Sequence, residues 1–204
     1  MTRETRLEQA VQNWKQWAST ADTSENGWET DFPEWPALME LATQTMTAPE
    51  ASPKELELVA FCWSISDESE ELSSAAAEQN DQCMPALDYI ARHGNERARW
   101  QVFAAIEKIT AATKKLLEAG LSDSDLYCRR RAVLSWARLG LPNQKQIIEA
   151  NIRHQDPYLR QATLDLAESS GDPSILTEVR MTLLRDPVDH VRRAAEQSVA
   201  AENR

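Results

Sequence analysis

The sequence predicts an all-α protein, a right-handed α-solenoid of stacked antiparallel helix pairs with about ten helices. The composition favours helix, since 204 residues include only five Gly, and Ala, Leu, Glu and Gln outnumber β-branched residues. Apolar residues recur at helical spacing along most of the chain. The C-terminal half also repeats itself with a period of roughly 30 residues, which is typical of solenoids.

The first half of the chain is helical without a visible repeat. Amphipathic stripes predict helices over residues 4–19, 33–46, 53–63, 72–79 and 84–93. Pro33 is expected to open the second helix, and residues 20–31 are expected to form a loop. Ser52 and Glu55 have the spacing of a capping box, with Pro53 at the first helical position. Trp14, Trp35, Trp63 and Trp136 lie on apolar stripes and are expected in the core.

The second half repeats two turn motifs. Gly140-Leu141-Pro142 recurs one period later as Gly171-Asp172-Pro173, and Asp156-Pro157 recurs in the same way as Asp186-Pro187. The glycines suit the end of one helix and the prolines the start of the next. Aligning the segments that follow gives an Arg column with the same period, made of Arg99, Arg130, Arg160 and Arg192. Each repeat is therefore expected to consist of a helix, a turn, a second helix and a tight link to the next repeat.

This pattern, Asp-Pro followed by Leu/Val-Arg-x-Ala and a Gly-Asp-Pro turn, resembles the short HEAT-like repeat of the phycobilin-lyase type over residues 94–202. The resemblance implies the fold more than an activity, because such repeats serve scaffolds, adaptors, lyases and DNA-repair enzymes. It also implies a structural ladder between repeats, formed by Arg130, Arg160 and Arg192 with Asp125, Asp156 and Asp186. A ligand-binding basic stripe is the alternative reading of the same arginines.

Charge divides the chain, which we expect to be one domain over 1–204. Residues 1–91 carry four basic and eighteen acidic groups, whereas residues 92–204 carry eighteen basic and fifteen acidic groups. The stretch from Trp14 to Trp63 holds five of the seven Trp. We therefore distinguish an acidic, Trp-rich part over 1–93 from the regular repeats over 94–204.

No motif in the sequence indicates catalysis, a cofactor or a metal. The three Cys are far apart, and the three His have no zinc-binding or di-iron spacing. No Gly-rich phosphate loop occurs, although carboxylates that converge in space could still form an active site. The start of the chain has charges but no apolar signal-peptide core, and no apolar run is long enough to span a membrane. We expect a cytoplasmic protein.

The first functional hypothesis is a non-catalytic protein-binding module, such as a toxin-neutralising immunity protein or an adaptor, with a basic protein as its partner. The candidate contacts are exposed aromatic and acidic residues of the first half, together with charged residues on the second helix of each repeat. They are Trp28, Glu29, Asp31, Asp67, Glu68, Glu70, Glu71, Lys114, Lys115, Lys145, Glu149 and Arg180.

Two other classes of function stay open. The more basic half could bind nucleic acid, as in the HEAT-like alkylpurine DNA glycosylases, but the catalytic Asp of that family has no evident counterpart here. A bilin lyase or chaperone depends on the repeat resemblance alone.

Overall fold

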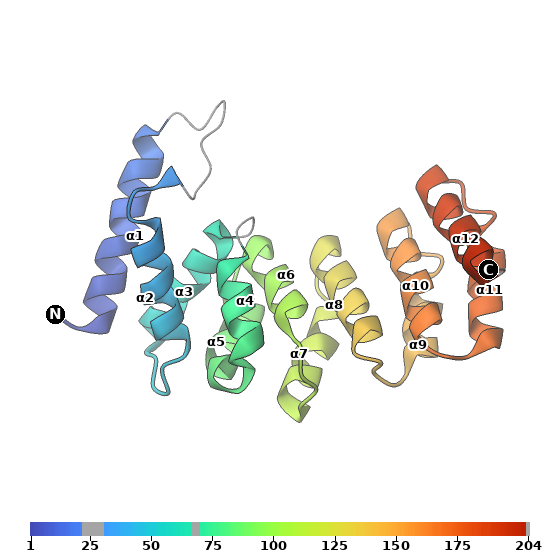
Figure 1. The fold of residues 1–204 in the computed structure, drawn as a ribbon, viewed down its shortest axis with the longest axis horizontal. Helices are drawn as coiled ribbons and strands as arrows, with labels where there is room; N and C mark the ends of the chain where they lie inside the picture. Colours follow the sequence, from blue (N-terminus) through green and yellow to red (C-terminus); the bar gives the residue numbers. More distant parts are fainter. Residues whose placement is uncertain (22–30, 67–69, 203–204) are drawn as a thin grey trace. The chain divides into compact units, whose positions relative to one another are not determined.

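The computed structural model describes residues 1–21, 31–66 and 70–202, and these residues form twelve helices and no β-strand (Figure 1). The prediction of an all-α protein is confirmed. The expected number of about ten helices is too low. Four of the helices, α4, α6, α7 and α9, have only eight to ten residues. Such short helices show too little apolar periodicity to be counted reliably from sequence.

The helices group into two compact units, Met1–Leu116 and Leu117–Arg204. The first unit contains α1 (Arg3–Thr20), α2 (Trp35–Met46), α3 (Pro53–Ile65), α4 (Glu71–Glu78), α5 (Asn80–His93) and α6 (Glu96–Ala105). Helix α7 (Ala111–Gly120) contains the boundary between the units. The second unit contains α8 (Leu126–Arg138), α9 (Gln144–Asn151), α10 (Pro157–Ser169), α11 (Pro173–Leu183) and α12 (Asp189–Glu202).

In the first unit, α3 is the central helix and packs against α1, α2, α5 and α6. Its sequence is mostly apolar, and Trp63 on it is fully buried. The predicted capping box is present, since the Ser52 hydroxyl accepts from the Glu55 N–H and the Glu55 carboxylate accepts from the Ser52 N–H. Pro33 lies two residues before α2 begins at Trp35, so the predicted start of that helix is two residues early.

An ion pair joins α1 to α3. The Arg3 guanidinium donates from Nε and Nη2 to the two carboxylate oxygens of Glu55, at 2.7 and 2.9 Å. Glu55 is buried, and the hydrogen bonds from Arg3 are the main cause that lowers the pKa of its carboxyl, helped by the Ser52 N–H. One carboxylate thus caps α3 and fixes α1 to it.

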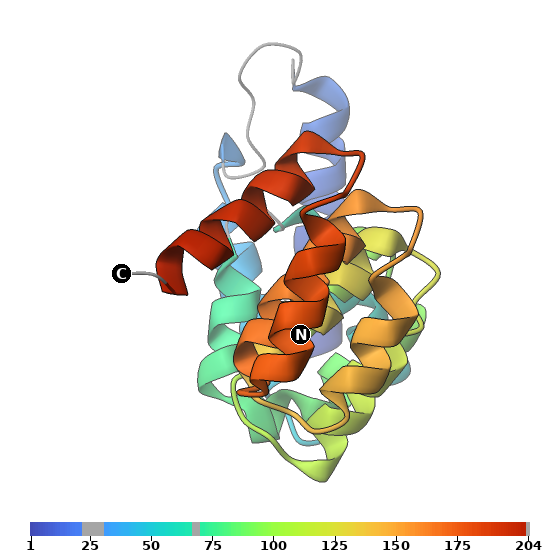
Figure 2. The same cartoon turned by 90° about the vertical axis from the view of Figure 1, so that its right-hand side faces the viewer.

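In the second unit, α10 is the central helix and packs against α8, α9, α11 and α12. Figure 1 shows α8 and α10 side by side, and Figure 2 shows α12 running obliquely to α11. Leu159 and Leu166 on α10 and Val133 on α8 are fully buried. Because α8 and α10 pack closely along their buried sides, their solvent-exposed sides lie next to each other on the surface.

Glycine and proline shape the turns of this unit largely as predicted. Gly140 and Gly171 have left-handed backbones, with φ of 60° and 67°, just after α8 and α10. Pro173 is the first residue of α11, as expected. Pro142, in contrast, lies two residues before α9, because Asn143 precedes the helix in a left-handed conformation.

The predicted core tryptophans are buried in three of four cases. Trp35, Trp63 and Trp136 are buried, whereas Trp14 is half-buried with its ring edge-on to Phe61. The three cysteines, Cys62, Cys83 and Cys128, are buried and free. Burial raises the pKa of the Cys62 thiol to about 12, so it has almost no reactive thiolate at neutral pH.

Candidate functional site

One arginine near the start of each of α8, α10 and α12 holds the connection before its helix. Arg129, Arg160 and Arg192 each donate to the backbone carbonyl six residues earlier, those of Asp123, His154 and Asp186. Each follows a fully buried residue, Cys128, Leu159 or Val191. The repeat register in the structure therefore aligns Arg129, and not Arg130, with Arg160 and Arg192.

The predicted ladder aspartates serve in different ways. Asp125 and Asp156 cap α8 and α10, where their carboxylates accept from the N–H of Cys128 and of Leu159. Asp186 lies between α11 and α12 and accepts two hydrogen bonds from Arg160, at 2.6 and 2.7 Å. These bonds from Arg160 are the main cause that holds the pKa of Asp186 below its ordinary value.

Arg130, outside that register, enters an aromatic column instead. Tyr127, Tyr158 and His190 directly precede the three buried residues, once in each repeat. The Arg130 guanidinium carbon lies 4.5 Å from the Tyr127 ring centroid and 5.0 Å from that of Tyr158. His190 stacks on Tyr158, with ring centroids 4.8 Å apart. The guanidinium is thus held by two rings, and the tyrosines remain 41% and 51% exposed.

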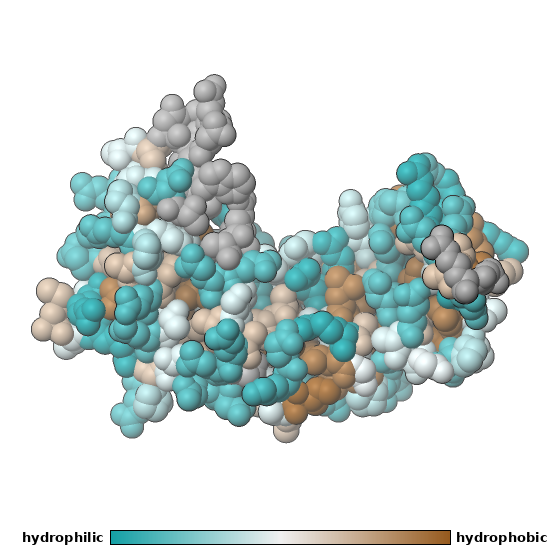
Figure 3. Space-filling view, viewed as in Figure 1, coloured by the Kyte–Doolittle hydropathy of each residue, from teal (hydrophilic) through white to brown (hydrophobic). Residues whose placement is uncertain are grey.

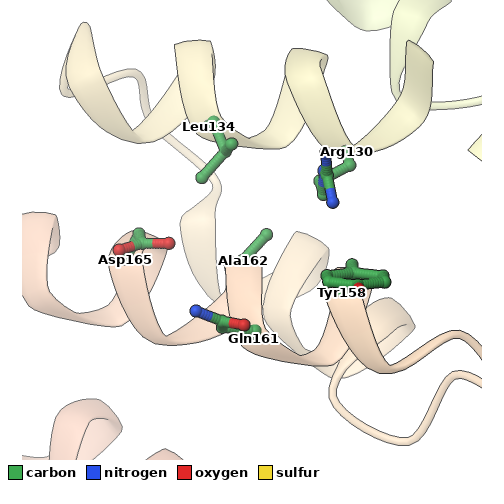
Figure 4. A pocket seen from close by; sticks show the side chains of 6 residues that line it. All are labelled: Arg130, Leu134, Tyr158, Gln161, Ala162 and Asp165. Atoms are coloured by element: carbon green, nitrogen blue, oxygen red, sulfur yellow. The ribbon is translucent and has the colours of Figure 1, made fainter. Parts of the chain in front are cut away.

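A pocket of about 270 Å³ opens beside this column, between α8 and α10. Six residues line it, and we call it the α8–α10 pocket: Arg130, Leu134, Tyr158, Gln161, Ala162 and Asp165. Figure 4 shows Arg130 and Tyr158 at one end, Asp165 at the other, and Leu134, Ala162 and Gln161 between them. The pocket therefore has a cationic end and an anionic end with an apolar middle.

The anionic end is strengthened by a second carboxylate. Loss of hydration around the Asp165 carboxyl, and then the charge of Glu168, hold the pKa of Asp165 above its ordinary value. The Asp165 residue as a whole is exposed on α10. Ser198 on α12 donates to Glu168, which keeps that second carboxylate near α12. A cationic group would relieve the repulsion at this end.

The predicted partner contacts of the first half lie only partly within the described residues. Trp28, Glu29, Asp67 and Glu68 lie outside them. Asp31, Glu70 and Glu71 are exposed, and the Glu71 carboxylate accepts from the indole N–H of Trp35 at 3.2 Å. Glu70 and Glu71 are adjacent at the start of α4, and Asp31 precedes α2.

The predicted contacts of the second helices lie on α7, α9 and α11. Lys115 is exposed and Lys114 half-buried on α7, and Lys145 and Glu149 are exposed on one face of α9. Arg180 on α11 is only 9% exposed. Its guanidinium donates to the hydroxyl and the carbonyl of Ser198 on α12 and also pairs with Glu202. Arg180 thus fixes α12 to α11.

The remaining surface is mostly hydrophilic. Figure 3 shows hydrophilic residues over most of the visible face of α1 to α5 and hydrophobic ones gathered near α7. Ile109, just before α7, is 54% exposed. No group of three His, Cys, Asp or Glu within residues 1–21, 31–66 and 70–202 could hold a metal ion. None of the described helices has the length and apolar character needed to cross a membrane.

Sequence reasoning did not identify Tyr127, Tyr158, Gln161 and Asp165 as site residues. A signal for the tyrosines was present, because an aromatic residue precedes the buried Cys128 and Leu159 at the same repeat position. A second signal was the spacing of four residues between each capping Asp and its Arg, which pairs Asp125 with Arg129. Gln161 and Asp165 carry no such signal, since only the packing of α10 on α8 places them in one pocket with Arg130.

Comparison of the chain with models of protein families, with curated proteins and with solved structures gives no match.

Proposed function

We propose that this chain is a non-catalytic protein-binding module, built as a right-handed solenoid of HEAT-like helix pairs, whose acidic first unit binds a basic protein. A stack of helix pairs offers a long surface for a partner. The proposal depends most on one observation, the excess of exposed carboxylates over α1 to α5.

Ten carboxylates of residues 3–21, 31–66 and 70–93 are exposed, against four exposed Lys and Arg side chains. The carboxylates, which we call the acidic surface, belong to Glu8, Asp31, Glu34, Glu40, Glu50, Glu57, Glu70, Glu71, Glu78 and Asp81. Of the four cations, Lys54 pairs with Glu57 at 3.6 Å, Arg92 pairs with Asp88 at 2.8 Å and Lys15 lies over the Phe61 ring. The negative field is therefore left largely uncompensated and would steer a basic partner.

Counting charged groups by unit places the excess of acidic groups in the first unit. Residues 1–116 contain ten basic and twenty acidic groups, whereas residues 117–204 contain twelve basic and thirteen acidic groups. The basic excess of the second half of the sequence lies in residues 92–116, within the first unit. Attraction for a basic protein is thus expected from the first unit and not from the second.

The test is to identify partners by cross-linking and mass spectrometry and to measure the affinity of the purified partner for two matched variants. One variant neutralises Glu8, Glu50 and Glu78 to Gln, and the other neutralises Glu118, Glu178 and Glu196 to Gln. All six residues are exposed, so neither variant should unfold. We expect the first variant to bind the partner at least tenfold more weakly and with a weaker dependence of affinity on salt. The affinity of the second variant should not change. Equal losses, or an acidic partner, would contradict the proposal.

An immunity protein and an adaptor differ in what they do to the partner. If the partner is a basic nuclease, an immunity protein abolishes its activity at a one-to-one ratio, whereas an adaptor leaves the activity intact. A toxin gene directly upstream of this gene would favour the immunity protein.

Nucleic-acid binding is the second candidate, and the column of Tyr127, Arg130 and Tyr158 favours it. Exposed rings beside a guanidinium can stack with unpaired bases. The nearly balanced charge of residues 117–204 speaks against it, because phosphate contacts supply most of such affinity. Fluorescence anisotropy with single-stranded and duplex DNA at about 50 mM salt tests it, and salt-dependent binding would support it.

A further inference from the structure

Arg130 presents a cation to the α8–α10 pocket without a counter-ion of its own. Its Nε is buried and has no hydrogen-bond partner, and no carboxylate of the described residues pairs with its guanidinium. Tyr127 and Tyr158 hold the guanidinium from their ring faces, which fixes its place and leaves the N–H groups of its two Nη atoms for another group. The group that these N–H donors bind best is a carboxylate.

Asp165 makes the other end of the pocket anionic, and the charge of Glu168 lies near enough to help raise the pKa of the Asp165 carboxyl. Both residues are exposed on α10, three positions apart, and therefore share one side of the helix. Their mutual repulsion contributes to the raised pKa of Asp165. A Lys or Arg side chain placed here would gain from both charges.

The two ends are too far apart for a single small zwitterion. Arg130 lies over Tyr158, and Asp165 follows Tyr158 by seven residues on the same helix. Seven residues of α-helix span about 10 Å. The floor between them is formed by Leu134 and Ala162, with the Gln161 amide beside it. A ligand must therefore bridge about 10 Å with an apolar middle and a charge at each end.

We propose that the α8–α10 pocket binds an extended peptide segment of a partner protein, with an acidic side chain at Arg130 and a Lys or Arg two residues away at Asp165. In an extended chain, residues two apart point to the same side and lie about 7 Å apart. The aliphatic stems of long side chains cover the remaining distance and lie over Leu134 and Ala162. This assignment rests on the proposal that the chain binds proteins, but it uses a surface other than the acidic surface.

A phosphorylated or polyanionic ligand fits this pocket less well. One phosphate could pair with Arg130, but the next group along the pocket meets Asp165, whose charge repels anions. The mixed charge of the pocket thus favours a peptide with both signs.

The experiment uses fluorescently labelled peptides and the full chain. The probes are Ala-Glu-Ala-Lys-Ala and the reversed Ala-Lys-Ala-Glu-Ala, each with a version in which Gln replaces Glu and another in which Gln replaces Lys. We expect one order to bind and its two neutralised versions to bind at least tenfold more weakly. Anisotropy titrations give each affinity.

Paired variants test the two ends separately. Arg130→Gln should weaken binding of the parent peptide at least tenfold and should not change binding of the peptide in which Gln replaces Glu. Asp165→Asn should likewise weaken binding of the parent peptide at least tenfold and should not change binding of the peptide in which Gln replaces Lys. Arg153→Gln and Glu196→Gln, both at exposed residues outside the pocket, are the matched controls and should leave binding unchanged. Urea unfolding checks that all variants are folded.

Three results would overturn the assignment: no binding of either peptide order, losses in the folded Arg130 and Asp165 variants that do not depend on the peptide charge, or preferred binding of single-stranded DNA at the same residues. The two proposals fail separately. Neutralising Glu8, Glu50 and Glu78 should leave peptide binding intact, and a failure of basic-protein binding would leave the peptide result standing.

Discussion

Arg160 on α10 and Asp186, in the link before α12, form a buried pair with two hydrogen bonds of 2.6 and 2.7 Å. The exposed fractions of the two residues are 8% and 7%. Arg160 also donates to the carbonyls of His154 and Gln155 before α10. One guanidinium thus connects the start of α10 to the link between α11 and α12.

Removing the carboxylate of this pair should be costly, because the buried guanidinium would lose its counter-ion. We expect Asp186→Ala to lower the free energy of unfolding by about 3 kcal/mol in urea titrations. Asp189→Ala is the control, since Asp189 is exposed and pairs with Arg192 and Arg193 at the surface. Its cost should stay below about 1 kcal/mol, and equal costs would argue against a structural role for the buried pair.

Glu55 should make stability depend on pH in the acid range. Its folded pKa lies below the ordinary value of 4.5, so its contribution is full above pH 4.5 and is lost as the pH falls through the lowered pKa. Glu55→Gln keeps an acceptor for the Ser52 N–H but removes the titrating charge. We expect this variant to be about 1–2 kcal/mol less stable at pH 7, with the difference shrinking on acidification below pH 4.5.

Unfolding curves at a series of pH values measure this difference. Glu57→Gln, at an exposed residue of the same helix, should show no such convergence. If the difference in free energy of unfolding between the wild type and Glu55→Gln stays constant down to low pH, Glu55 acts by packing and not by charge.

Arg180 should hold α12 in place. Its guanidinium donates to the Ser198 hydroxyl at 2.9 Å and to the Ser198 carbonyl at 2.8 Å. We expect Arg180→Ala to cost about 2 kcal/mol and to speed amide hydrogen exchange first in α12. Arg185→Ala, at an exposed position, should leave exchange in α12 as it is. Unchanged exchange in the Arg180 variant would favour its role in partner contact.

Gly140 tests the left-handed turn after α8. Its φ is 60°, and an added Cβ would meet no atom within 4 Å, so any cost arises from the backbone alone. We expect Gly140→Ala to lower the free energy of unfolding by about 1–2 kcal/mol. Gly140→Asn should cost less, because Asn adopts this conformation more readily. A neutral Ala variant would show that the turn relaxes to a right-handed form.

The helical content and much of the turn chemistry were predictable because they depend on neighbouring residues. The capping box of Ser52 and Glu55 and the left-handed glycines are such local features. The Arg column was misaligned by one residue at its second member, because the run Arg129-Arg130-Arg131 offers three candidates and the sequence alone does not show which one follows the buried position. The Cys at position 128 obscured that position, since it is a small residue where Leu and Val stand in the other two helices.

By itself, the sequence determined that this protein is helical, that its net negative charge is concentrated in the first half and that its C-terminal helices follow a repeat of about 30 residues. Periodicity and capping carry that information locally. Only the tertiary structure decided that Arg160 finds Asp186, that Arg180 is buried against α12 and that Arg130 faces Asp165 across a pocket. These contacts depend on how α8, α10 and α12 pack. The sequence would be the same whether these side chains faced one another or solvent, so it cannot show the contacts.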